Sequence, residues 1–587
     1  MKTLLLGNEA VARGLYEAGL SVASSYPGTP STEITEALAV YDEVYSEWAP
    51  NEKVALEVAF GASLGGRRAF CGMKHVGLNV AADPLFTASY TGVNAGLVIA
   101  VADDPGMHSS QNEQDSRHYA RAAKLPMLEP SDSGECLEFS KYAFELSETF
   151  DTPVILRTCT RVAHSQSIVN LGERVVPEIV PYEKNIAKYV MMPNFAKQRH
   201  PIVEQRTKAL IGLAETSPLN RMEIGSDTEV GYITSGTAYQ YVREVYGENA
   251  CVLKLGIVYP LPEKLIRDFA AQVKRVVVVE ELDPFIEEHC KTLGIAVQGK
   301  DIFSICGEFS QNVIAETLDH GIHSGAEISD DIPARPPVMC AGCPHRGLFY
   351  TLMKNKVTTI GDIGCYTLGA AAPLAAIDST ICMGASVSGL HGFMHAEGNE
   401  AAKNAVCVIG DSTFMHSGVT GLINIAYNGG NSTVIILDNS ITGMTGHQQN
   451  PTTGLNIKNE PAGKIDLEAL CRAIGIKRVR VVDPYDLAAC NTAVKEEIAA
   501  EEPSVIITRR PCALLKTVKA KPPLVVNADK CKSCKACMKI GCPAISMKEF
   551  EADGYTAKKA VIDPTLCVGC GVCTQMCMFG ALKGDAV

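Results

Sequence analysis

Cysteines near the end of this 587-residue chain have the spacing of iron–sulfur ligands. Eight of the 22 cysteines fall into two groups: Cys531, Cys534, Cys537 and Cys542, and then Cys567, Cys570, Cys573 and Cys577. Two-residue gaps let three thiolates on one tight loop reach three corners of an iron–sulfur cube, so each fourth ligand must come from elsewhere. Zinc in C-x2-C pairs is the alternative, but it explains neither the two triplets nor the proline after Cys542.

This segment resembles the two-cluster bacterial ferredoxins over its whole length. Its second group has their C-x2-C-x2-C-x3-C spacing, whereas the first group has four residues before its last cysteine. In such ferredoxins each group lends its last cysteine to the other cluster. The resemblance therefore implies one cluster on Cys531, Cys534, Cys537 and Cys577, and another on Cys542, Cys567, Cys570 and Cys573. We expect the extra residue to lengthen the crossover and to leave the triplet intact.

Composition places the chain among ordinary globular proteins. Hydrophobic residues make up 46% and charged residues 20%, which argues against a disordered, collagenous or coiled-coil chain. The formal net charge of −13 argues against general nucleic-acid binding, and no apolar run reaches the ~18–20 residues of a membrane span. Residues 1–7 predict a strand and not a signal peptide, and so many cysteines favour metal clusters in a reducing, cytoplasmic location.

Apolar strand-like runs alternate with helical stretches over most of the chain. This alternation predicts three α/β domains with mainly parallel sheets. Charged or Pro-rich stretches at 330–337 and 519–523 mark boundaries. We expect five segments: a first α/β domain at 1–184, a helical linker at 185–222, a second α/β domain at 223–330, a third at 331–518 and the cysteine-rich segment at 519–587.

The third domain carries oxygen ligands at two strand ends. The predicted strand 405–409 ends in Gly410-Asp411-Ser412, and the strand 433–437 ends in Asp438-Asn439. Open α/β sheets bind ligands at the carboxyl ends of their strands. Asp411 and Asn439 offer the hard oxygens that Mg²⁺ takes when it binds a diphosphate. Either turn alone would be ordinary, but the two together favour a cofactor site.

The separation of these turns resembles the G-D-G…N signature of thiamine diphosphate enzymes, with Ser412 in the third position. The loop 438–453 is similar to a loop of the 2-oxoacid:ferredoxin oxidoreductases, although Thr442, His447 and Asn450 replace its Tyr, Gly and Ser. The resemblance implies that Asp411, Asn439 and the backbone carbonyl of Ile441 hold Mg²⁺. It also implies cofactor contacts from Gly410, Ser412 and Thr445.

A carboxylate that activates the cofactor is expected in the first domain. Glu52 stands nine residues before Gly61 in a helix-like stretch, which resembles the Glu-x8-Gly pattern of thiamine diphosphate folds. Such a carboxylate drives the aminopyrimidine to tautomerise, so that its amino group can take the C2 proton. Glu57 is the competing candidate, with a poorer spacing.

Two further stretches of the first domain suggest a site for the substrate carboxylate. The turn 26–31, Y-P-G-T-P-S, resembles a loop of the same oxidoreductases, which implies that Thr29 turns its hydroxyl toward a 2-oxoacid. Lys74 and His75 follow another strand and could help to neutralise that carboxylate. His391, ahead of the predicted magnesium loop, is a candidate of the same kind; the alternative for both histidines is a structural role.

Nearly the whole chain resembles the alpha subunits of the indolepyruvate:ferredoxin oxidoreductase family. C-A-G-C-P-H-R at 340–346, D-I-G-C-Y-T-L-G at 362–369 and the run from Gly410 carry the resemblance, together with the order of the domains. It implies pyrimidine-binding, transketolase-C-like, diphosphate-binding and two-cluster ferredoxin domains. The implied reaction converts aryl 2-oxoacids and coenzyme A to acyl-coenzyme A and CO2. The implied partners are a beta subunit, in a tetramer of two alpha and two beta chains, and an external ferredoxin.

A third cluster is also expected. Cys340, Cys343 and Cys365 resemble the ligands of a cluster that lies beside thiamine in related oxidoreductases, and Cys512 is a candidate for the fourth ligand. The alternative is that these are buried free thiols.

Two other functions stay open from the sequence. A non-oxidative thiamine diphosphate decarboxylase would not need the clusters, and a plain electron-transfer module would not need Glu52, Asp411 and Asn439. The substrate is also open among indolepyruvate, phenylpyruvate types, pyruvate, 2-oxoglutarate and branched-chain oxoacids.

Overall fold

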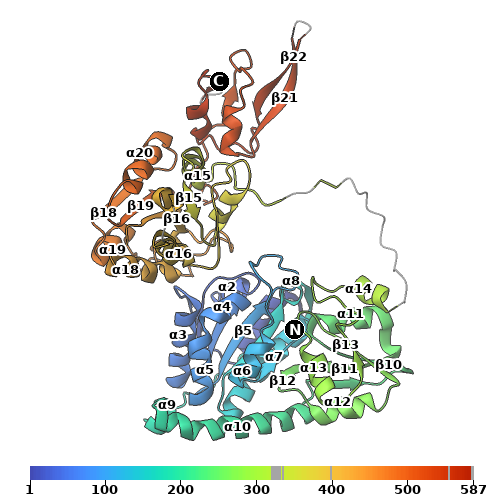
Figure 1. The fold of residues 1–587 in the computed structure, drawn as a ribbon. Coiled ribbons are helices and arrows are strands. Elements are labelled where there is room, and N and C mark those ends of the chain that lie inside the picture. Colours follow the sequence, from blue (N-terminus) through green and yellow to red (C-terminus); the bar gives the residue numbers. More distant parts are fainter. Residues whose placement is uncertain (319–331, 334–335, 397–399, 553–554, 584–587) are drawn as a thin grey trace. The chain divides into compact units, whose positions relative to one another are not determined.

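The computed structural model describes residues 1–318, 332–333, 336–396, 400–552 and 555–583. The chain forms two compact units, 1–329 and 330–587, and each is described by itself. Both units are built on mainly parallel sheets (Figure 1), which confirms the predicted α/β class. The finer division into five segments stays a prediction.

A seven-stranded sheet in the order β12-β6-β7-β5-β4-β2-β3 forms the centre of the first unit. All neighbours in it pair in parallel except β6 and β12. Because side chains alternate along a strand, Val98 and Ala100 of β5 lie in one core, whereas Ile99 and Val101 lie in the other. The strands are β2 (Val22–Ser25), β3 (Tyr45–Trp48), β4 (Ala69–Lys74), β5 (Leu97–Asp103), β6 (Met127–Leu128), β7 (Val154–Cys159) and β12 (Ile257–Tyr259).

Helices cover both faces of this sheet. One core packs against α3 (Glu52–Leu64), α4 (His75–Val80), α5 (Ala82–Thr91) and α6 (Arg117–Ala123). The other core packs against α1 (Gly7–Glu17), α2 (Thr32–Leu38) and α7 (Ser133–Phe150). The predicted first strand is β1 (Lys2–Leu6); it pairs with β8 (Gln166–Asn170), which follows α8 (Thr160–His164), in a separate antiparallel pair.

The same unit contains a second, five-stranded sheet in the order β14-β13-β10-β11-β9. Its strands are β9 (Arg221–Glu223), β10 (Asp227–Ser235), β11 (Ala250–Leu255), β13 (Arg275–Val279) and β14 (Val297–Gln298). Its helices are α11 (Gly236–Tyr246), α12 (Glu263–Ala270), α13 (Phe285–Thr292) and α14 (Gln311–Thr317). The short α9 (Ile186–Tyr189) and the long α10 (Pro193–Thr216) connect the two parts, and α10 contacts both α5 and α12 (Figure 1).

The second unit begins with a five-stranded, fully parallel sheet in the order β15-β16-β17-β19-β18. Its strands are β15 (Thr358–Ile360), β16 (Ala405–Gly410), β17 (Thr433–Asp438), β18 (Arg478–Val482) and β19 (Ser504–Arg509). One face packs against α15 (His345–Lys354) and α20 (Leu487–Ile498). The other packs against α16 (Ala385–Met394), α18 (Val419–Tyr427) and α19 (Leu467–Ile474).

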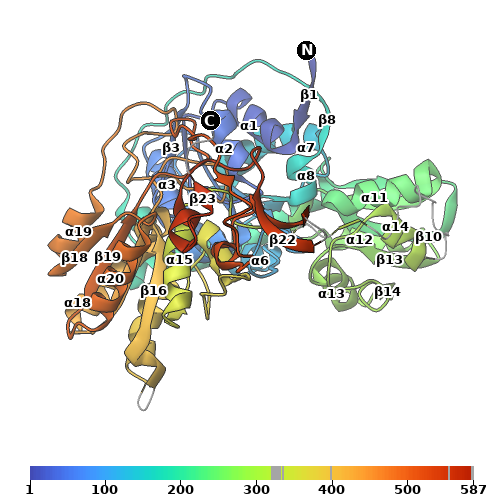
Figure 2. The same ribbon diagram turned by 90° about the horizontal axis from the view of Figure 1, so that it is seen from above.

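The cysteine-rich segment follows this sheet in the chain. It contains two antiparallel pairs, β20 (Val525–Val526) with β23 (Leu582–Lys583) and β21 (Ile545–Ala552) with β22 (Tyr555–Ile562). Two 3-10 turns, η5 (Ala536–Ile540) and η6 (Val572–Met576), lie in contact with each other. Helix α15 contacts η5, so this segment lies against one end of the preceding domain (Figures 1 and 2).

No helix within the described ranges combines the length and the apolar character that a bilayer crossing requires.

Candidate active site and redox centres

The structure brings Asp411 to the carboxyl edge of the second unit's parallel sheet. Asp411 opens the short helix α17 (Asp411–Thr413) directly after β16, and its side chain is buried. The Ser412 N–H donates to its Oδ1 at 2.9 Å, and the Thr452 hydroxyl donates to its Oδ2 at 3.3 Å. Burial and the neighbouring Asp438 raise the pKa of the Asp411 carboxyl to about 7. A carboxylate in this position gains strongly from a nearby cation.

Three oxygen atoms converge beside Asp411. The side-chain oxygen of Asn439 lies 2.7 Å from the carbonyl oxygen of Ile441 and 3.3 Å from Oδ1 of Asp411. Acceptor oxygens at such distances need a proton donor or a cation between them, and turning the amide over would supply two N–H donors. Mg²⁺ prefers a set of one carboxylate and neutral oxygens when it binds a diphosphate. The three atoms therefore fit a magnesium ion.

The loop after Asn439 is held by its own polar side chains. The Thr442 hydroxyl donates to Oγ of Ser412 at 2.9 Å, which ties the loop to the first turn of the site. Thr445 donates to Oε1 of Gln448 at 2.6 Å, so its hydroxyl proton is engaged within the loop. The Ser412 hydroxyl thus has a structural partner in the position where the family signature has glycine.

Glu52 and Glu57 differ sharply in their surroundings. Asn51 caps α3 by accepting from the Val54 N–H at 2.9 Å, and Glu52 follows as the first helical residue. Glu52 is only 4% exposed, and a Cβ atom added to Gly77 would lie 2.5 Å from its Oε1. Glu57 has 46% of its side chain exposed and pairs with Lys53. Burial and the close backbone of Gly77 fix the Glu52 carboxylate, which favours Glu52 over Glu57 for a role that needs a defined position.

The turn that contains Thr29 lies next to Lys74. A Cβ atom added to Gly28 would lie 3.1 Å from Cγ of Lys74, and Thr29 is half-buried. The Lys74 ammonium donates to the Ser109 carbonyl and to Oγ of Ser110, each at 2.9 Å. Burial lowers the pKa of Lys74 to about 8, although Asp104 and Glu52 favour its charged form.

His75 lies beside Lys74 in the first unit, whereas His391 belongs to the second unit. Nε2 of His75 is 3.2 Å from the Asn112 carbonyl, and its buried Nδ1 has no hydrogen-bond partner among the described residues. A Cβ atom added to Gly430 would lie 2.5 Å from Nδ1 of His391. Gly430 precedes β17, so His391 lies at the amino edge of the sheet, opposite to Asp411. The structure does not support an active-site role for His391, because helix α16 carries it to the wrong end of the strands.

Sequence reasoning missed Asp104. It follows the buried strand β5, and its carboxylate accepts from the Ser109 N–H and from the hydroxyls of Ser110 and Thr160 at 2.7–2.8 Å. It thereby holds the loop that receives Lys74. The signal was available, because an Asp at the end of a buried strand is the same pattern that pointed to Asp411.

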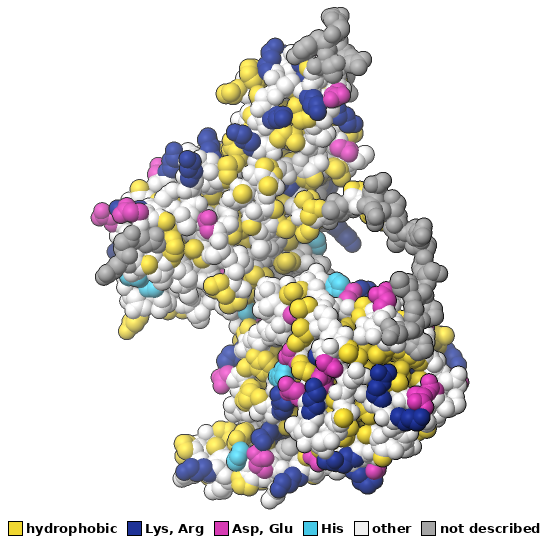
Figure 3. All heavy atoms as spheres, turned by 45° about the vertical axis from the view of Figure 1, so that its right-hand side comes forward, with side chains coloured by type: hydrophobic (Ala, Val, Ile, Leu, Met, Phe, Trp, Pro, Cys, Tyr) yellow, Lys and Arg dark blue, Asp and Glu magenta, His cyan; other side chains and the backbone are white. Residues whose placement is uncertain are grey.

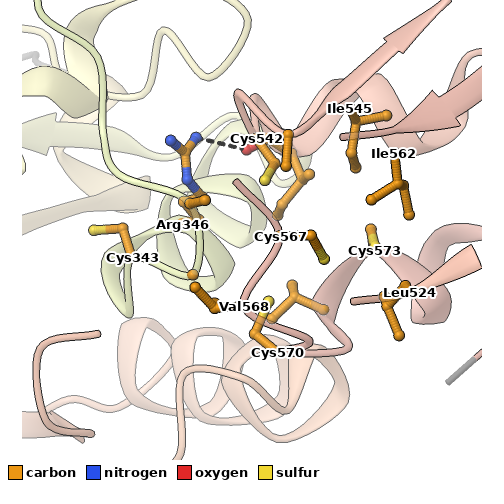
Figure 4. A pocket seen from close by; sticks show the side chains of 15 residues that line it. Cys343, Arg346, Leu524, Cys542, Ile545, Ile562, Cys567, Val568, Cys570 and Cys573 are labelled. Carbon is orange, nitrogen blue, oxygen red and sulfur yellow. Dashed lines mark hydrogen bonds between the residues drawn. The ribbon is translucent and has the colours of Figure 1, made fainter. Parts of the chain in front are cut away.

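Each predicted set of four ferredoxin cysteines lines one cavity. Figure 4 shows the first of these cavities, at the junction with the preceding domain, where Leu524, Ile545 and Ile562 are among the other lining residues. Lys532 and Lys535 take part in lining the second cavity. The backbone N–H groups of Ala560 and Ala581 point at thiol sulfurs of the second set, at 3.5 and 3.3 Å. The first cavity is lined by Cys542, Cys567, Cys570 and Cys573, and the second by Cys531, Cys534, Cys537 and Cys577.

Four other cysteines gather beside the cofactor loop. The Cys343 N–H donates to the Cys340 carbonyl at 3.1 Å, and Sγ of Cys512 lies 3.8 Å from Nε2 of His447. Burial raises the pKa of Cys365 to about 11, with smaller contributions from the nearby Cys512 and Cys340. A Cβ atom added to Gly443 would lie 3.4 Å from the Cys365 sulfur. These contacts join Cys340, Cys343, Cys365 and Cys512 to the loop that follows Asn439.

Family models match three parts of the chain. Residues 13–212 match the thiamine diphosphate-binding domain of the pyruvate flavodoxin/ferredoxin oxidoreductases. Residues 362–508 match the C-terminal binding domain of thiamine pyrophosphate enzymes, and residues 530–581 match a 4Fe-4S dicluster domain. The chain thus contains thiamine diphosphate-binding domains and a ferredoxin-type domain for two clusters.

The relatives that match nearly the whole chain are named as the same subunit, IorA. The indolepyruvate oxidoreductase subunit IorA of Archaeoglobus fulgidus is 41% identical over 99% of this chain and 97% of its own length. The same subunit of Pyrococcus horikoshii is 40% identical over the same shares. The 2-oxoglutarate synthase subunit KorA of Methanothermobacter marburgensis is more distant, at 25% identity over 47% of this chain and 86% of its own. A solved 2-oxoglutarate:ferredoxin oxidoreductase from Magnetococcus marinus covers 54% of this chain and 65% of its own, with 19% identity and a TM-score of 0.47. On the strength of the full-length matches, this chain belongs to the indolepyruvate oxidoreductase IorA family, which consists of oxidoreductases.

Proposed function

We propose that this chain oxidatively decarboxylates aryl 2-oxoacids such as indolepyruvate, with coenzyme A as acyl acceptor and ferredoxin as electron acceptor. One observation carries this proposal. The loop that begins at Asn439 contacts both Asp411, in the oxygen cluster at the sheet edge, and the thiol of Cys365. A magnesium diphosphate site and an electron acceptor on one loop suit a decarboxylation that is also an oxidation. The IorA name of the full-length relatives supports the aryl substrate.

Asp411, Asn439 and the Ile441 carbonyl would hold Mg²⁺ and, through it, the diphosphate of the cofactor. Thiamine diphosphate, when bound, supplies a nucleophilic carbon and a sink for the electrons left when CO2 departs. The chain's own residues must therefore bind the cofactor, position its acid/base groups and carry the electrons away.

Glu52 would hold a proton at the pyrimidine ring of the cofactor. A carboxylate can share that proton reversibly, which general acid/base catalysis requires. The burial of Glu52 against Gly77 supports this role, because it leaves the carboxylate little freedom to move.

Thr29 and Lys74 would bind the carboxylate of the oxoacid. A hydroxyl and a partly desolvated ammonium can together bind an anion, and the turn that contains Thr29 lies against the Lys74 side chain. His75 would add a hydrogen-bonding group there through its buried ring nitrogen.

Three clusters would carry the electrons. The two cysteine-lined cavities support the crossed pairing of the ferredoxin ligands, and the gathering of Cys340, Cys343, Cys365 and Cys512 supports a third cluster. Iron analysis tests the third cluster. About twelve atoms per chain are expected, and about eight in a fully loaded protein would contradict it.

The relatives are named as one subunit of an oxidoreductase, which supports a partner subunit for this chain. We propose a tetramer of two alpha and two beta chains, with part of the substrate pocket supplied by the partner. No disulfide joins any of the described cysteines, which suits a reducing compartment, and the cytoplasm is the compartment we propose.

A substrate panel tests the proposed activity. With its partner subunit, the enzyme should oxidise indolepyruvate and phenylpyruvate at least about tenfold more efficiently than pyruvate or 2-oxoglutarate. The reverse order of preference would replace the aryl substrate by another 2-oxoacid, as in the more distant KorA relative. It would leave the reaction type unchanged.

A further inference from the structure

A buried cation lies within the second unit, at the junction between the parallel-sheet domain and the ferredoxin segment. Arg346 ends the C-A-G-C-P-H-R run and lies in the first turn of α15, where it is only 4% exposed. Its Nε donates to the Cys340 carbonyl at 3.1 Å, and its Nη2 donates to the Met339 carbonyl. Its Nη1 donates to the carbonyls of Ile540 and Gly541, at 3.2 and 2.5 Å (Figure 4). The guanidinium therefore joins the first domain of this unit to the ferredoxin segment.

The partners of Arg346 are neutral. Among the residues that the structure describes, no carboxylate lies within ion-pair distance of its guanidinium, although a buried charge is costly without a counter-charge. The guanidinium donates to the Cys340 carbonyl, and Arg346 lines one cavity together with Cys343, Cys542 and Cys570. These four thiols belong to two different cysteine sets. The missing negative charge must therefore come from cysteine ligands on both sides of the guanidinium.

We propose that Arg346 is the shared counter-ion of two clusters, one on Cys340, Cys343, Cys365 and Cys512 and the other on Cys542, Cys567, Cys570 and Cys573. The proposal rests on the proposed function for the first of these clusters. The guanidinium would offset part of the negative charge of both clusters and thereby favour their reduction.

The two ferredoxin cavities differ in the residues that line them, and Arg346 lies at only one of them. Ala341, Gly342, Cys343 and Arg346 take part in lining the cavity of the Cys542 set. The cavity of the Cys531 set is lined only by residues of the ferredoxin segment, among them the exposed Lys532 and Lys535. The Cys542 cluster is therefore the inner one and the Cys531 cluster the outer one.

This role also explains the unusual spacing of the first cysteine group. Four residues, and not three, separate Cys537 from Cys542, and the last two of them supply the carbonyls that bind Arg346. Gly541 has φ +68°, and a Cβ atom there would lie 3.2 Å from Nη1 of Arg346. The extra residue thus gives the ferredoxin segment a turn that fits the guanidinium, besides lengthening the crossover.

Other close contacts stabilise the same junction around Arg346. The Tyr485 hydroxyl donates to the Gly342 carbonyl, and the side-chain amide of Gln575 donates to the Tyr485 carbonyl at 2.6 Å. A Cβ atom added to Gly342, which has φ +70°, would lie 2.2 Å from Cγ2 of Val568. The two parts therefore approach closely enough for one cation to act on both.

Redox titration of the holoenzyme, followed by electron paramagnetic resonance, tests the counter-ion role without any turnover. Reduction adds one negative charge to a cluster, so a neighbouring cation makes reduction easier. In Arg346→Met we expect reduction of the Cys542 cluster to become roughly tenfold less favourable, which corresponds to about 59 mV for one electron. Arg346→Lys, which keeps the charge, should stay within about twofold of the wild type. Arg472→Met removes an exposed arginine that pairs with Glu468, and it should cause no change. An unchanged potential in iron-replete Arg346→Met would overturn the counter-ion role, as would a tenfold change in Arg346→Lys.

The potential of the Cys542 cluster reports on Arg346 whether or not the third cluster is present, so the redox titration and the iron analysis can fail separately.

Discussion

At the scale of single residues, the chemistry depends on two sets of buried polar groups. The oxygens of Asp411, Asn439 and Ile441 face one another, and Arg346 has only neutral hydrogen-bond partners among the described residues. Motif spacing predicted the first set from the sequence. It could not predict the second, because two of the carbonyls that bind Arg346 lie almost 200 positions away in the chain.

Replacement of Asp411 tests the oxygen cluster. Asp411→Ala removes the one carboxylate of the set, so Mg²⁺ and thiamine diphosphate should bind at least about tenfold more weakly. Asp411→Asn keeps an oxygen ligand and should have a smaller effect. Calorimetric titration with the cofactor measures the affinity, and circular dichroism should show that both variants remain folded. Wild-type affinity in Asp411→Ala would disprove the assignment.

The two glutamates of α3 form a matched pair. Glu52→Gln keeps the shape of the side chain but cannot share a proton, so turnover should fall by about 10²–10⁴-fold while the cofactor still binds. Glu57→Gln changes a largely exposed residue and should stay close to the wild type. The opposite result, a slow Glu57 variant beside an active Glu52 variant, would exchange the two roles.

Lys74 should make substrate binding depend on pH. Its pKa of about 8 means that the ammonium is charged below this value and neutral above it. Because the charged form binds a carboxylate, KM for the oxoacid should rise by up to about tenfold per pH unit above about pH 8. Lys74→Met should have a high KM that no longer varies in this range. An equal pH dependence in both proteins would contradict a role for Lys74.

At the scale of elements, the positions of the strands were more predictable than the way in which the strands pair. The expected strands 405–409 and 433–437 appear as β16 and β17, each one residue longer, because buried parallel strands are nearly continuous apolar runs. Strand β12 pairs antiparallel with β6 at the edge of the first sheet, although it lies within the predicted second domain. Such long-range pairing leaves no local mark in the sequence, so periodicity could not reveal it.

Gly342 provides an element-scale prediction at the junction of the ferredoxin segment. Its positive φ and the nearby Val568 leave no room for a side chain, so Gly342→Ala should destabilise the protein by roughly 1–3 kcal/mol. Gly463→Ala is the control, because an added Cβ there meets no atom within 4 Å. Thermal unfolding measures both, and equal melting temperatures would mean that the junction is looser than described.

At the scale of the whole molecule, charge is distributed unevenly along the chain. Residues 521–587 contain nine Lys and six acidic residues, a net charge of +3, whereas the chain as a whole carries −13. Four lysines around the first cysteine group are exposed, and Figure 3 shows basic and hydrophobic side chains interspersed over one face of this segment. These are Lys530, Lys532, Lys535 and Lys539. Free ferredoxins are usually acidic, so the outer cluster faces a surface suited to such a carrier. The alternative is that the lysines only keep the loop in solution or offset the charge of the cluster.

Salt dependence tests this docking surface. Exposed charges are screened within about 8–10 Å at physiological salt, so ferredoxin reduction should slow more steeply with salt than reduction of a neutral dye. Lys532→Glu combined with Lys535→Glu should slow ferredoxin reduction severalfold and spare the dye assay. Identical salt profiles for the two acceptors, or an unaffected double variant, would place the docking surface elsewhere.

The central claim is that one reaction joins decarboxylation to oxidation. The most direct test measures release of CO2 from indolepyruvate by the enzyme with its partner subunit, with and without coenzyme A and a low-potential acceptor. We predict that sustained release requires both, and that acyl-coenzyme A and reduced acceptor form in a ratio of about one to two one-electron equivalents. Full CO2 release with neither present, accompanied by an aldehyde product and clusters that stay oxidised, would contradict the account.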